Sequence, residues 1–280
     1  MVIISDCIAK GSAIIKPNIP DSRFEAEILL SHVLKKDRLY LTVHKNDVVS
    51  DEDAQLFFKL CSRRSYGEPS AYITGVKEFM SMEFEVNSNV LIPRPETEHL
   101  VELIADKYQT KEVHILDLCT GSRAIACSLA KLIENSSVTA ADISSDALDV
   151  AKRNAKKIGV DNKIRFIRCD VLKEYDFGQK YDVVVSNPPY IESETISTLD
   201  VGVKDFEPLL ALDGGDDGLT FYRAITRGIR NMLNIGGELY YEIGLNQGNA
   251  VKNIMESYLT NVTVIKDYSG HDRIVCGQLL

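Results

Sequence analysis

The segment "EVHILDLCTGSRAIACSLAKLI" (residues 112–133) decides the fold class. It begins with an apolar run typical of a buried strand, passes through a short loop with one glycine, and continues with a helical pattern. The same order of strand and helix recurs at residues 137–159, and further strand patterns follow at 163–170 and 181–187. Strands separated by helices of this length predict an α/β fold, in which a parallel, doubly wound sheet carries helices on both faces.

The end of the chain departs from this alternation. After a helix near residues 219–233, a strand at 237–244 and a helix at 247–258, two strand patterns follow, joined only by "SGHD" (269–272). Four residues are too few for a parallel crossover, so these last two strands are expected to be antiparallel.

The first part of the chain has a different pattern, which is helical without intervening strands. Segments 21–36 and 50–65 have helical periodicity, and Ser50 is a candidate N-cap of the second helix. The residues expected to face the core of this helical unit are Phe24, Ile28, Leu29, Leu56, Phe57 and Leu60. Alternation at residues 79–86 then predicts a β-hairpin, with turn residues in "VNSNV" (86–90).

Composition restricts the class of protein. The formal net charge of the 280 residues is −9, with 41 acidic and 32 basic side chains. That average field repels a phosphate backbone, so nucleic acid is disfavoured as a substrate. The six cysteines form no C-x-x-C pair or cluster of metal-ligand spacing, which indicates buried thiols and no metal site. Without a signal-peptide pattern or a membrane-span pattern, the protein is expected to be cytoplasmic.

Four predicted strands end in polar residues, at Asp117, Asp142, Asp170 and Asn187. Sheets of this kind bind ligands at the carboxyl ends of their strands. Asp142 lies 21 residues beyond Gly121, a spacing at which an acidic side chain accepts hydrogen bonds from ribose hydroxyls. The chain has neither a P-loop ending nor a full G-x-G-x-x-G pattern. A site that binds ribose but lacks a phosphate-binding motif favours S-adenosylmethionine over a dinucleotide as the cofactor.

The strand "YDVVVSN" leads into two prolines and a tyrosine, "NPPY" (187–190). A conjugated NH2 group is a poor nucleophile unless fixed acceptors hold both of its N–H bonds. The side-chain oxygen of Asn187 and the carbonyl of Pro188 are such acceptors, and neither proline adds a competing backbone donor. Tyr190 is suited to stacking on a flat amide or base. These four residues alone leave a glutamine amide and an adenine open as methyl acceptors.

Three motifs together resemble a known family. They are "GEPSAYITGVKEFMSMEFEVNSNVLIPRPETE" (67–98), "SNPPYI" (186–191) and "EIGLNQG" (242–248), and the resemblance covers nearly the whole chain. The chain resembles the peptide chain release factor glutamine N5-methyltransferases, the HemK-type enzymes. The resemblance implies a class I methyltransferase fold, with a Rossmann-like, seven-stranded sheet and an antiparallel last strand. It also implies a helical substrate-recognition domain over residues 1–74, a β-hairpin linker over 75–93 and a methyltransferase domain over 94–280.

The same resemblance implies a function and a set of site residues. The family transfers a methyl group from S-adenosylmethionine to the glutamine side-chain amide in the Gly-Gly-Gln loop of class I release factors, its protein partners. The implied cofactor contacts are Cys119, Thr120, Gly121, Ser122, Arg123, Asp142, Asp170, Val171 and Asn187. The implied catalytic and substrate contacts are Asn187, Pro188, Pro189 and Tyr190.

One position departs from the family pattern, because Arg123 stands where the last glycine of the cofactor loop is usual. Its side chain is expected either to point to solvent or to intrude on the methionyl end of the cofactor. Two alternatives therefore stand beside glutamine methylation. The first is an N6-adenine nucleic-acid methyltransferase, and the second is a release-factor-binding protein that no longer holds the cofactor.

Overall fold

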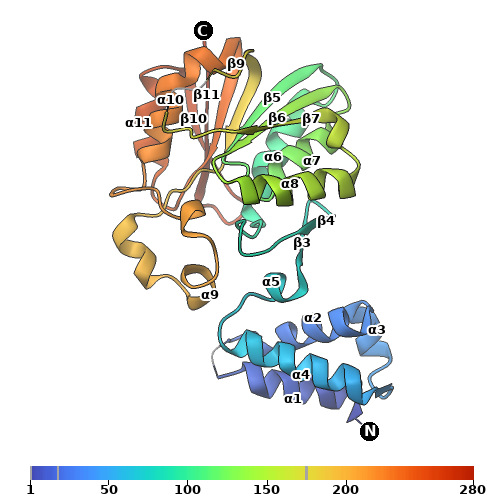
Figure 1. Ribbon diagram of the computed structural model, residues 1–280. Helices are drawn as coiled ribbons and strands as arrows, with labels where there is room; N and C mark the ends of the chain where they lie inside the picture. Colours follow the sequence, from blue (N-terminus) through green and yellow to red (C-terminus); the bar gives the residue numbers. More distant parts are fainter. Residues whose placement is uncertain (1, 18, 174–175) are drawn as a thin grey trace. The chain divides into compact units, whose positions relative to one another are not determined.

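The computed structural model describes residues 2–17, 19–173 and 176–280. The chain divides into two compact units, of which the first comprises Met1–Val76 with Asp200–Phe206 and the second comprises Lys77–Leu199 with Glu207–Leu280. Figure 1 shows the elements of both units. Within the described ranges, no helix has the length and apolar character needed to cross a membrane.

The second unit is built on a seven-stranded sheet in the order β10-β11-β9-β8-β5-β6-β7. Neighbours from β9 to β7 run parallel, whereas β11 is antiparallel to both β9 and β10. The strands are β5 (Val113–Leu118), β6 (Ser136–Asp142), β7 (Ile164–Arg168), β8 (Tyr181–Ser186), β9 (Leu233–Glu242), β10 (Thr260–Lys266) and β11 (Asp272–Gln278). The α/β class and the antiparallel last strand are thus confirmed.

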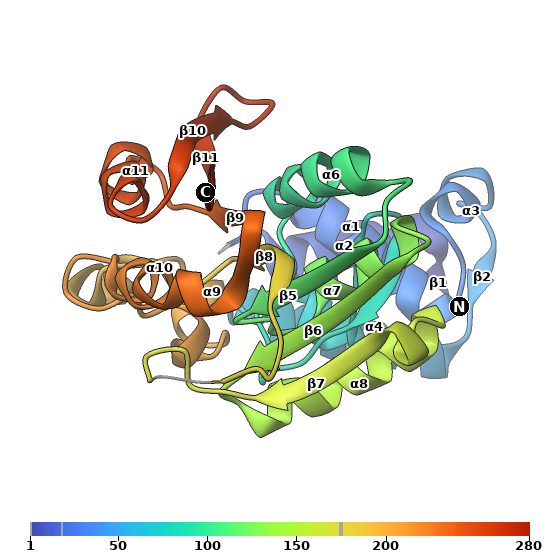
Figure 2. The same ribbon diagram turned by 90° about the horizontal axis from the view of Figure 1, so that it is seen from above.

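Helices cover both faces of this sheet (Figure 2). One face packs against α6 (Glu96–Tyr108), α7 (Ala124–Leu132) and α8 (Ser145–Ile158), and the other against α10 (Thr220–Met232) and α11 (Gly248–Glu256). Short 3₁₀ turns lie at η1 (Asp161–Lys163), η2 (Ser193–Thr198) and η3 (Leu209–Ala211).

The apolar run of β8 shows why both faces are covered. Successive side chains of a strand point to opposite faces. Val183 and Val185 accordingly join the core under α6, α7 and α8, while Val184 joins the core under α10 and α11. A continuous run of valines is therefore buried on both sides of the sheet.

The predicted hairpin consists of β3 (Val76–Phe79) and β4 (Met82–Glu85), which form a two-stranded sheet. Its turn is Met80 and Ser81, whose φ angles of 51° and 57° are those of the mirror-image turns that suit twisted hairpins. The expectation that residues 86–90 form this turn is wrong, because they follow β4. Composition misled here, since the polar residues of 86–90 suit a turn better than Met80 does.

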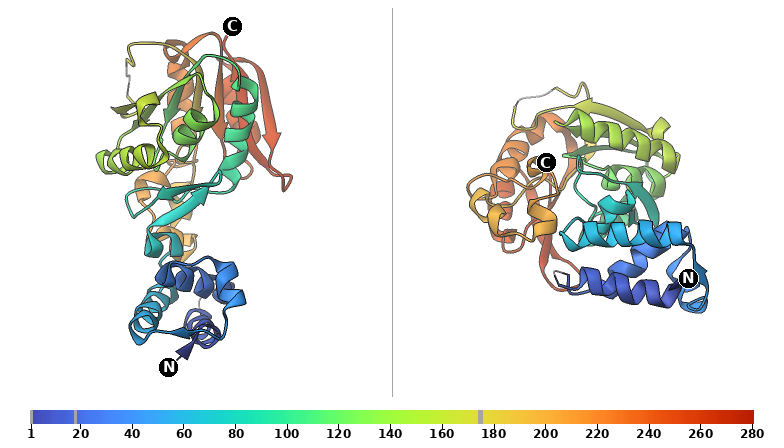
Figure 3. Two further views of the ribbon diagram at one scale, coloured as in Figure 1. Left: turned by 90° about the vertical axis from the view of Figure 1, so that its right-hand side faces the viewer. Right: turned by 60° about the horizontal axis from the view of Figure 1, so that its bottom comes forward.

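The first unit is helical, as predicted, and the blue helices in Figure 3 belong to it. It comprises α1 (Ile4–Ile15), α2 (Ser22–Leu34), α3 (Arg38–Val43), α4 (Asp51–Ser65), α5 (Ser70–Thr74) and α9 (Val201–Lys204), with a short antiparallel pair of β1 (Val2–Ile3) and β2 (Val48–Val49). The hydroxyl of Ser50 accepts a hydrogen bond from the Asp53 amide at 3.0 Å, so Ser50 caps α4 as expected.

Two of the residues expected in this core face outward. Phe24 is 46% exposed, and the guanidinium carbon of Arg38 lies 4.3 Å from the centre of its ring. Leu56 is 47% exposed. The helix α1 precedes the segments in which the sequence predicts helices, and it packs against both α2 and α4. Because α1 determines which faces of its neighbours are buried, Ala26 and Leu30 take the inward positions on α2.

Gly11 lies where α1 meets α4. A β-carbon built on Gly11 would lie 2.4 Å from the ring of Phe57 and 3.0 Å from Cys61 Sγ. We expect Gly11→Ala to destabilise the protein by about 1–2 kcal/mol, because overpacking outweighs the gain in helix propensity. Urea unfolding measures the change.

Gly228 in α10 is the matched control, because its β-carbon would meet only the flexible Met232 methyl group at 3.3 Å. Gly228→Ala should be neutral or stabilising by up to about 1 kcal/mol. Equal unfolding free energies for the two variants would contradict the packing assigned to Gly11.

Candidate functional site

Polar residues gather at the carboxyl ends of four adjacent parallel strands. The strand order places β8, β5, β6 and β7 side by side, and Asp117, Asp142, Asp170 and Asn187 lie at or just beyond their ends. The hydroxyl of Ser186 donates to the Leu118 carbonyl at 2.7 Å and ties the ends of β8 and β5 together. The four strand ends selected from the sequence thus meet at one edge of the sheet.

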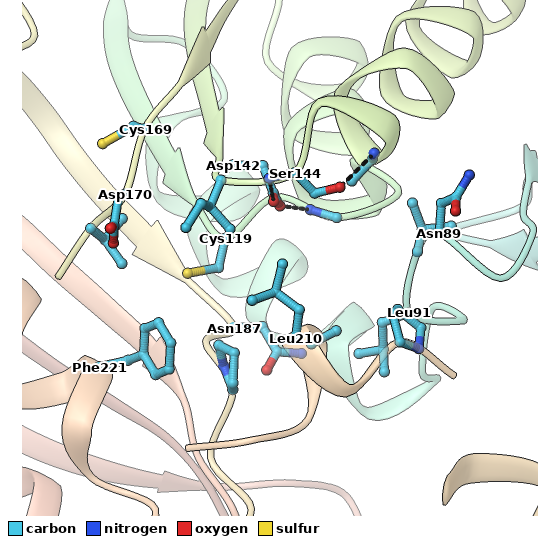
Figure 4. Close-up of a pocket in the computed structure, with 18 of the residues that line it drawn as sticks. Asn89, Leu91, Cys119, Asp142, Ser144, Cys169, Asp170, Asn187, Leu210 and Phe221 are labelled. Atoms are coloured by element: carbon cyan, nitrogen blue, oxygen red, sulfur yellow. Dashed lines mark hydrogen bonds between the residues drawn. The ribbon is translucent and has the colours of Figure 1, made fainter. Parts of the chain in front are cut away.

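A pocket of about 270 Å³ opens at this edge (Figure 4). Seven of the residues predicted for the site line it, namely Cys119, Gly121, Asp142, Asp170, Val171, Asn187 and Pro189. Thr120, Ser122, Arg123, Pro188 and Tyr190 belong to the same loops but lie outside the lining.

Sequence reasoning missed other walls of the pocket. Residues 88–91, after the hairpin, form one side, and Ser144, Leu210 and Phe221 contribute from elsewhere. Residues 88–91 fall in a segment interpreted as turn and connector, and apolar residues such as Leu210 and Phe221 carry no chemical signal. Only their position in the fold reveals them.

Asp142 connects two of the loops. Its Oδ2 accepts a hydrogen bond from the Gly121 amide at 2.9 Å, and its Oδ1 accepts one from the Ser144 amide at 2.9 Å. Burial raises the pKa of this carboxyl, and the backbone amides oppose the rise. Each oxygen keeps a lone pair for a further donor, so Asp142 is able to accept hydrogen bonds from a ligand's hydroxyl groups.

The loop after β5 is held away from ordinary backbone geometry. Cys119, Gly121 and Arg123 all have positive φ angles, of 58°, 52° and 69°. The Thr120 hydroxyl donates to Asp117, and the Arg123 amide donates to the Thr120 carbonyl at 2.8 Å. Asp117 is fully buried, and burial raises its pKa to about 7. The loop therefore turns tightly over a buried carboxyl and presents Gly121 to the pocket.

Arg123 takes neither of the two expected orientations. Its side chain is fully buried, with the guanidinium carbon 3.1 Å from the centre of the Phe166 ring on β7. Among the residues that the structure describes, none forms a hydrogen bond with its three guanidinium nitrogens. Burial lowers the pKa of Arg123 to about 10, although Cys127 and Asp117 oppose the shift. The side chain thus belongs to the core beneath the loop, and the pocket is lined without it.

Asn187 follows β8 and lines the same pocket as Asp142 and Asp170. Its Nδ2 donates to the Thr97 hydroxyl of α6 at 3.5 Å. Pro188 and Pro189 after it are buried. No proline has a backbone N–H, so this wall offers acceptors without adjacent backbone donors.

Tyr190 is half-buried, and burial raises its pKa to about 12. Its carbonyl accepts a hydrogen bond from the Gln247 side chain at 3.0 Å, while that side chain also accepts from the Gly244 amide at 2.9 Å. The residues of "EIGLNQG" therefore hold the backbone of the "NPPY" segment.

The segment "PRPETE" also has a defined partner. Arg94 forms an ion pair with Glu207 at 2.5 Å, and Glu207 is only 5% exposed. The same carboxyl accepts a hydrogen bond from the Ile92 amide at 3.2 Å. Glu207 follows η2 and α9 in the chain, far from Arg94 in the sequence. This pair fixes the chain just after residues 88–91.

Two family models match the chain. Residues 6–75 match the PrmC N-terminal domain, and residues 95–203 match the methyltransferase small domain. A methyltransferase structure from Pyrococcus furiosus superposes with a TM-score of 0.52 at 18% identity, covering 71% of this chain and 89% of that chain. At this identity the superposition supports the methyltransferase fold alone.

Curated relatives extend over almost the whole sequence. The chain is 39% identical to the release factor glutamine methyltransferase of Clostridium acetobutylicum, over 97% of each chain. It is 41% identical to the protein of the same name from Moorella thermoacetica, over 90% of this chain and 89% of that protein. The chain therefore belongs to the release factor glutamine methyltransferase family.

Proposed function

We propose that this protein transfers a methyl group from S-adenosylmethionine to the side-chain amide nitrogen of the glutamine in the Gly-Gly-Gln loop of class I peptide chain release factors. The observation that carries the proposal is the position of Asn187 and Pro189 on a pocket that Asp142 and Asp170 also line. Family membership supports the choice of glutamine as the methyl acceptor.

The residues of the pocket suit the methyl donor. Asp142 offers carboxylate oxygens for ribose hydroxyls, and apolar walls such as Ile143, Val171 and Phe221 suit a flat adenine ring. The donor, when bound, supplies an electrophilic methyl group on a sulfonium sulfur. Cys119 and Gly121 lie on the same surface of the pocket and leave space there, because no atom lies within 4 Å of a β-carbon built on Gly121.

The "NPPY" segment provides what the acceptor amide requires. In the proposed complex, the Asn187 side-chain oxygen and the Pro188 carbonyl each accept a hydrogen bond from the NH2 group of the glutamine. These two hydrogen bonds fix the nitrogen for attack on the methyl group. Tyr190 stacks on the flat amide. The nitrogen becomes strongly acidic once methylated, so its proton leaves without a dedicated general base.

Mass spectrometry of a release factor after incubation with the protein and S-adenosylmethionine tests the proposal. We expect one added methyl group on the glutamine of the Gly-Gly-Gln loop. Methylation of DNA or RNA alone would instead favour the N6-adenine alternative.

Asn187→Ala should lower kcat by about 100-fold, as for loss of an oriented polar group in other enzymes, while the Kd for S-adenosylhomocysteine changes much less. Equal losses in kcat and affinity would contradict the acceptor role of Asn187.

Arg123 bears on the cofactor-impaired alternative. Because its side chain lies in the core and outside the pocket lining, we expect the protein to bind S-adenosylhomocysteine near the micromolar range, about −8 kcal/mol. Arg123→Gly should change that affinity by less than about threefold. Calorimetric titration measures both values.

Asp142→Asn is the control for this titration, because the amide would place a donor against the Gly121 or the Ser144 amide. Its affinity should fall at least about tenfold, or 1.4 kcal/mol. A gain of more than about tenfold in Arg123→Gly would show that the arginine impairs the cofactor site.

Gly218 lies directly against the "NPPY" backbone. Its φ is +68°, and an added β-carbon would lie 2.4 Å from the Tyr190 carbonyl oxygen and 2.7 Å from Gln247 Nε2. Gly218→Ala should displace that hydrogen-bonded pair and lower methyl transfer at least about tenfold, since small misplacements of reacting groups are costly. Initial rates on a release factor measure the loss.

Gly236 gives the matched control, because its φ is +82° but no atom lies within 4 Å of an added β-carbon. Gly236→Ala carries a similar backbone strain of about 1–2 kcal/mol and should leave the rate unchanged. Equal rates for the two variants would rule out close packing at Gly218 as a requirement for transfer.

A further inference from the structure

Glu242 ends β9 beside the "NPPY" segment and has no role in the transfer described above. Its side chain is only 1% exposed. Within residues 2–17, 19–173 and 176–280, its Oε2 has no hydrogen-bond partner. A buried carboxyl oxygen without a partner costs stability, so its presence next to a catalytic segment requires a reason.

The register of the sheet places Glu242 next to Asn187. Ser186 of β8 pairs with Tyr241 of the parallel strand β9, so the next residue of each strand is Asn187 and Glu242. Thr97, in the first turn of α6, is the third member of the group and is only 4% exposed. The Thr97 hydroxyl and the Asn187 side chain lie near enough to the Glu242 carboxyl that both lower its pKa.

The charges around Glu242 are mixed. Burial raises its pKa to about 7, and the carboxylate of Glu96 on α6 adds to the rise. The neighbouring Thr97 and Asn187 side chains and the positive charge of Arg273 on β11 oppose it. A perturbed carboxyl beside a candidate site is typical of functional sites.

The orientation of the Asn187 amide decides whether it serves as an acceptor. The two ends of an asparagine amide have nearly the same shape, but one is a pure acceptor and the other carries two donors. A turn of 180° would present N–H groups to the N–H groups of a glutamine amide. The Nδ2 of Asn187 is directed towards the Thr97 hydroxyl, so its Oδ1 is the end left for the pocket.

We propose that Glu242 and Thr97 are positioning residues for methyl transfer, which accept hydrogen bonds from Asn187 Nδ2 and thereby keep its Oδ1 turned towards the methyl acceptor. The proposal rests on the proposed function for its effect on the reaction. An ionised carboxylate accepts hydrogen bonds and donates none, and the Thr97 hydroxyl, which accepts a hydrogen bond from Asn187, keeps its own proton available for the Glu242 carboxyl. Together they leave the amide one favourable orientation.

Two substitutions of Glu242 separate orientation from structure. Glu242→Leu removes the acceptor and fills a similar volume with apolar atoms, so we expect kcat on a release factor to fall at least about tenfold. The KM for the methyl donor should change less than about threefold, and the melting temperature should not fall, because an apolar side chain replaces a buried, incompletely paired carboxyl. Glu242→Gln keeps an acceptor oxygen and should restore kcat to within about threefold of the original protein.

Nuclear magnetic resonance of the protein with ¹⁵N-labelled asparagine tests the hydrogen bond without any substrate. The Asn187 Nδ2 protons, assigned by their loss in Asn187→Ser, should exchange slowly in the original protein and in Glu242→Gln, and faster in Glu242→Leu. Unchanged exchange in Glu242→Leu, or an undiminished kcat, would overturn the inference. If the original protein methylates no release factor but the Asn187 protons respond as described, the proposed function fails while the orientation of Asn187 by Glu242 stands.

Discussion

The parallel pairing of β5 with both β6 and β8 is the constraint on which the larger unit depends. Asp117 of β5 is level with Ala140 on one side and with Val185 on the other. Because all three strands run in the same direction, the loops that follow them meet at one edge. The cofactor loop, the ribose-binding candidate Asp142 and the acceptor wall at Asn187 are therefore brought together by register alone, although they are far apart in the sequence.

The polar groups at this edge differ in how completely they are satisfied. Both oxygens of Asp142 bind backbone amides, whereas one oxygen of Asp117, one of Glu242 and the guanidinium of Arg123 have no hydrogen-bond partner among the described residues. Sites that bind and transform ligands commonly depart from the rule that buried polar groups are paired. The stability lost at these positions is offset by the two apolar cores that pack against the faces of the sheet.

Sequence patterns predicted the parts of the fold that local periodicity controls. The strands near Asp117, Asp142 and Asn187 are rich in apolar residues, and seven of the residues predicted at and after the strand ends line the pocket. What the sequence could not show depends on contacts between distant segments. The outward position of Phe24 follows from the packing of α1, and the pocket wall at Leu210 follows from the path of a loop that no local pattern describes. The orientation of Arg123 depends likewise on Phe166, 43 residues later in the chain.

A glycine in the cofactor loop serves two separate needs, and Arg123 shows that they are separable. The first is open space at the backbone where a ligand can approach, and Gly121 leaves such space on the pocket surface. The second is a left-handed backbone at the start of α7, which costs a residue with a β-carbon about 1–2 kcal/mol. Stacking of the guanidinium on Phe166 opposes that cost, whereas the burial of its nitrogens, unpaired among the described residues, adds to it. The arginine thus affects the packing beneath the loop, while the pocket surface keeps a glycine at position 121.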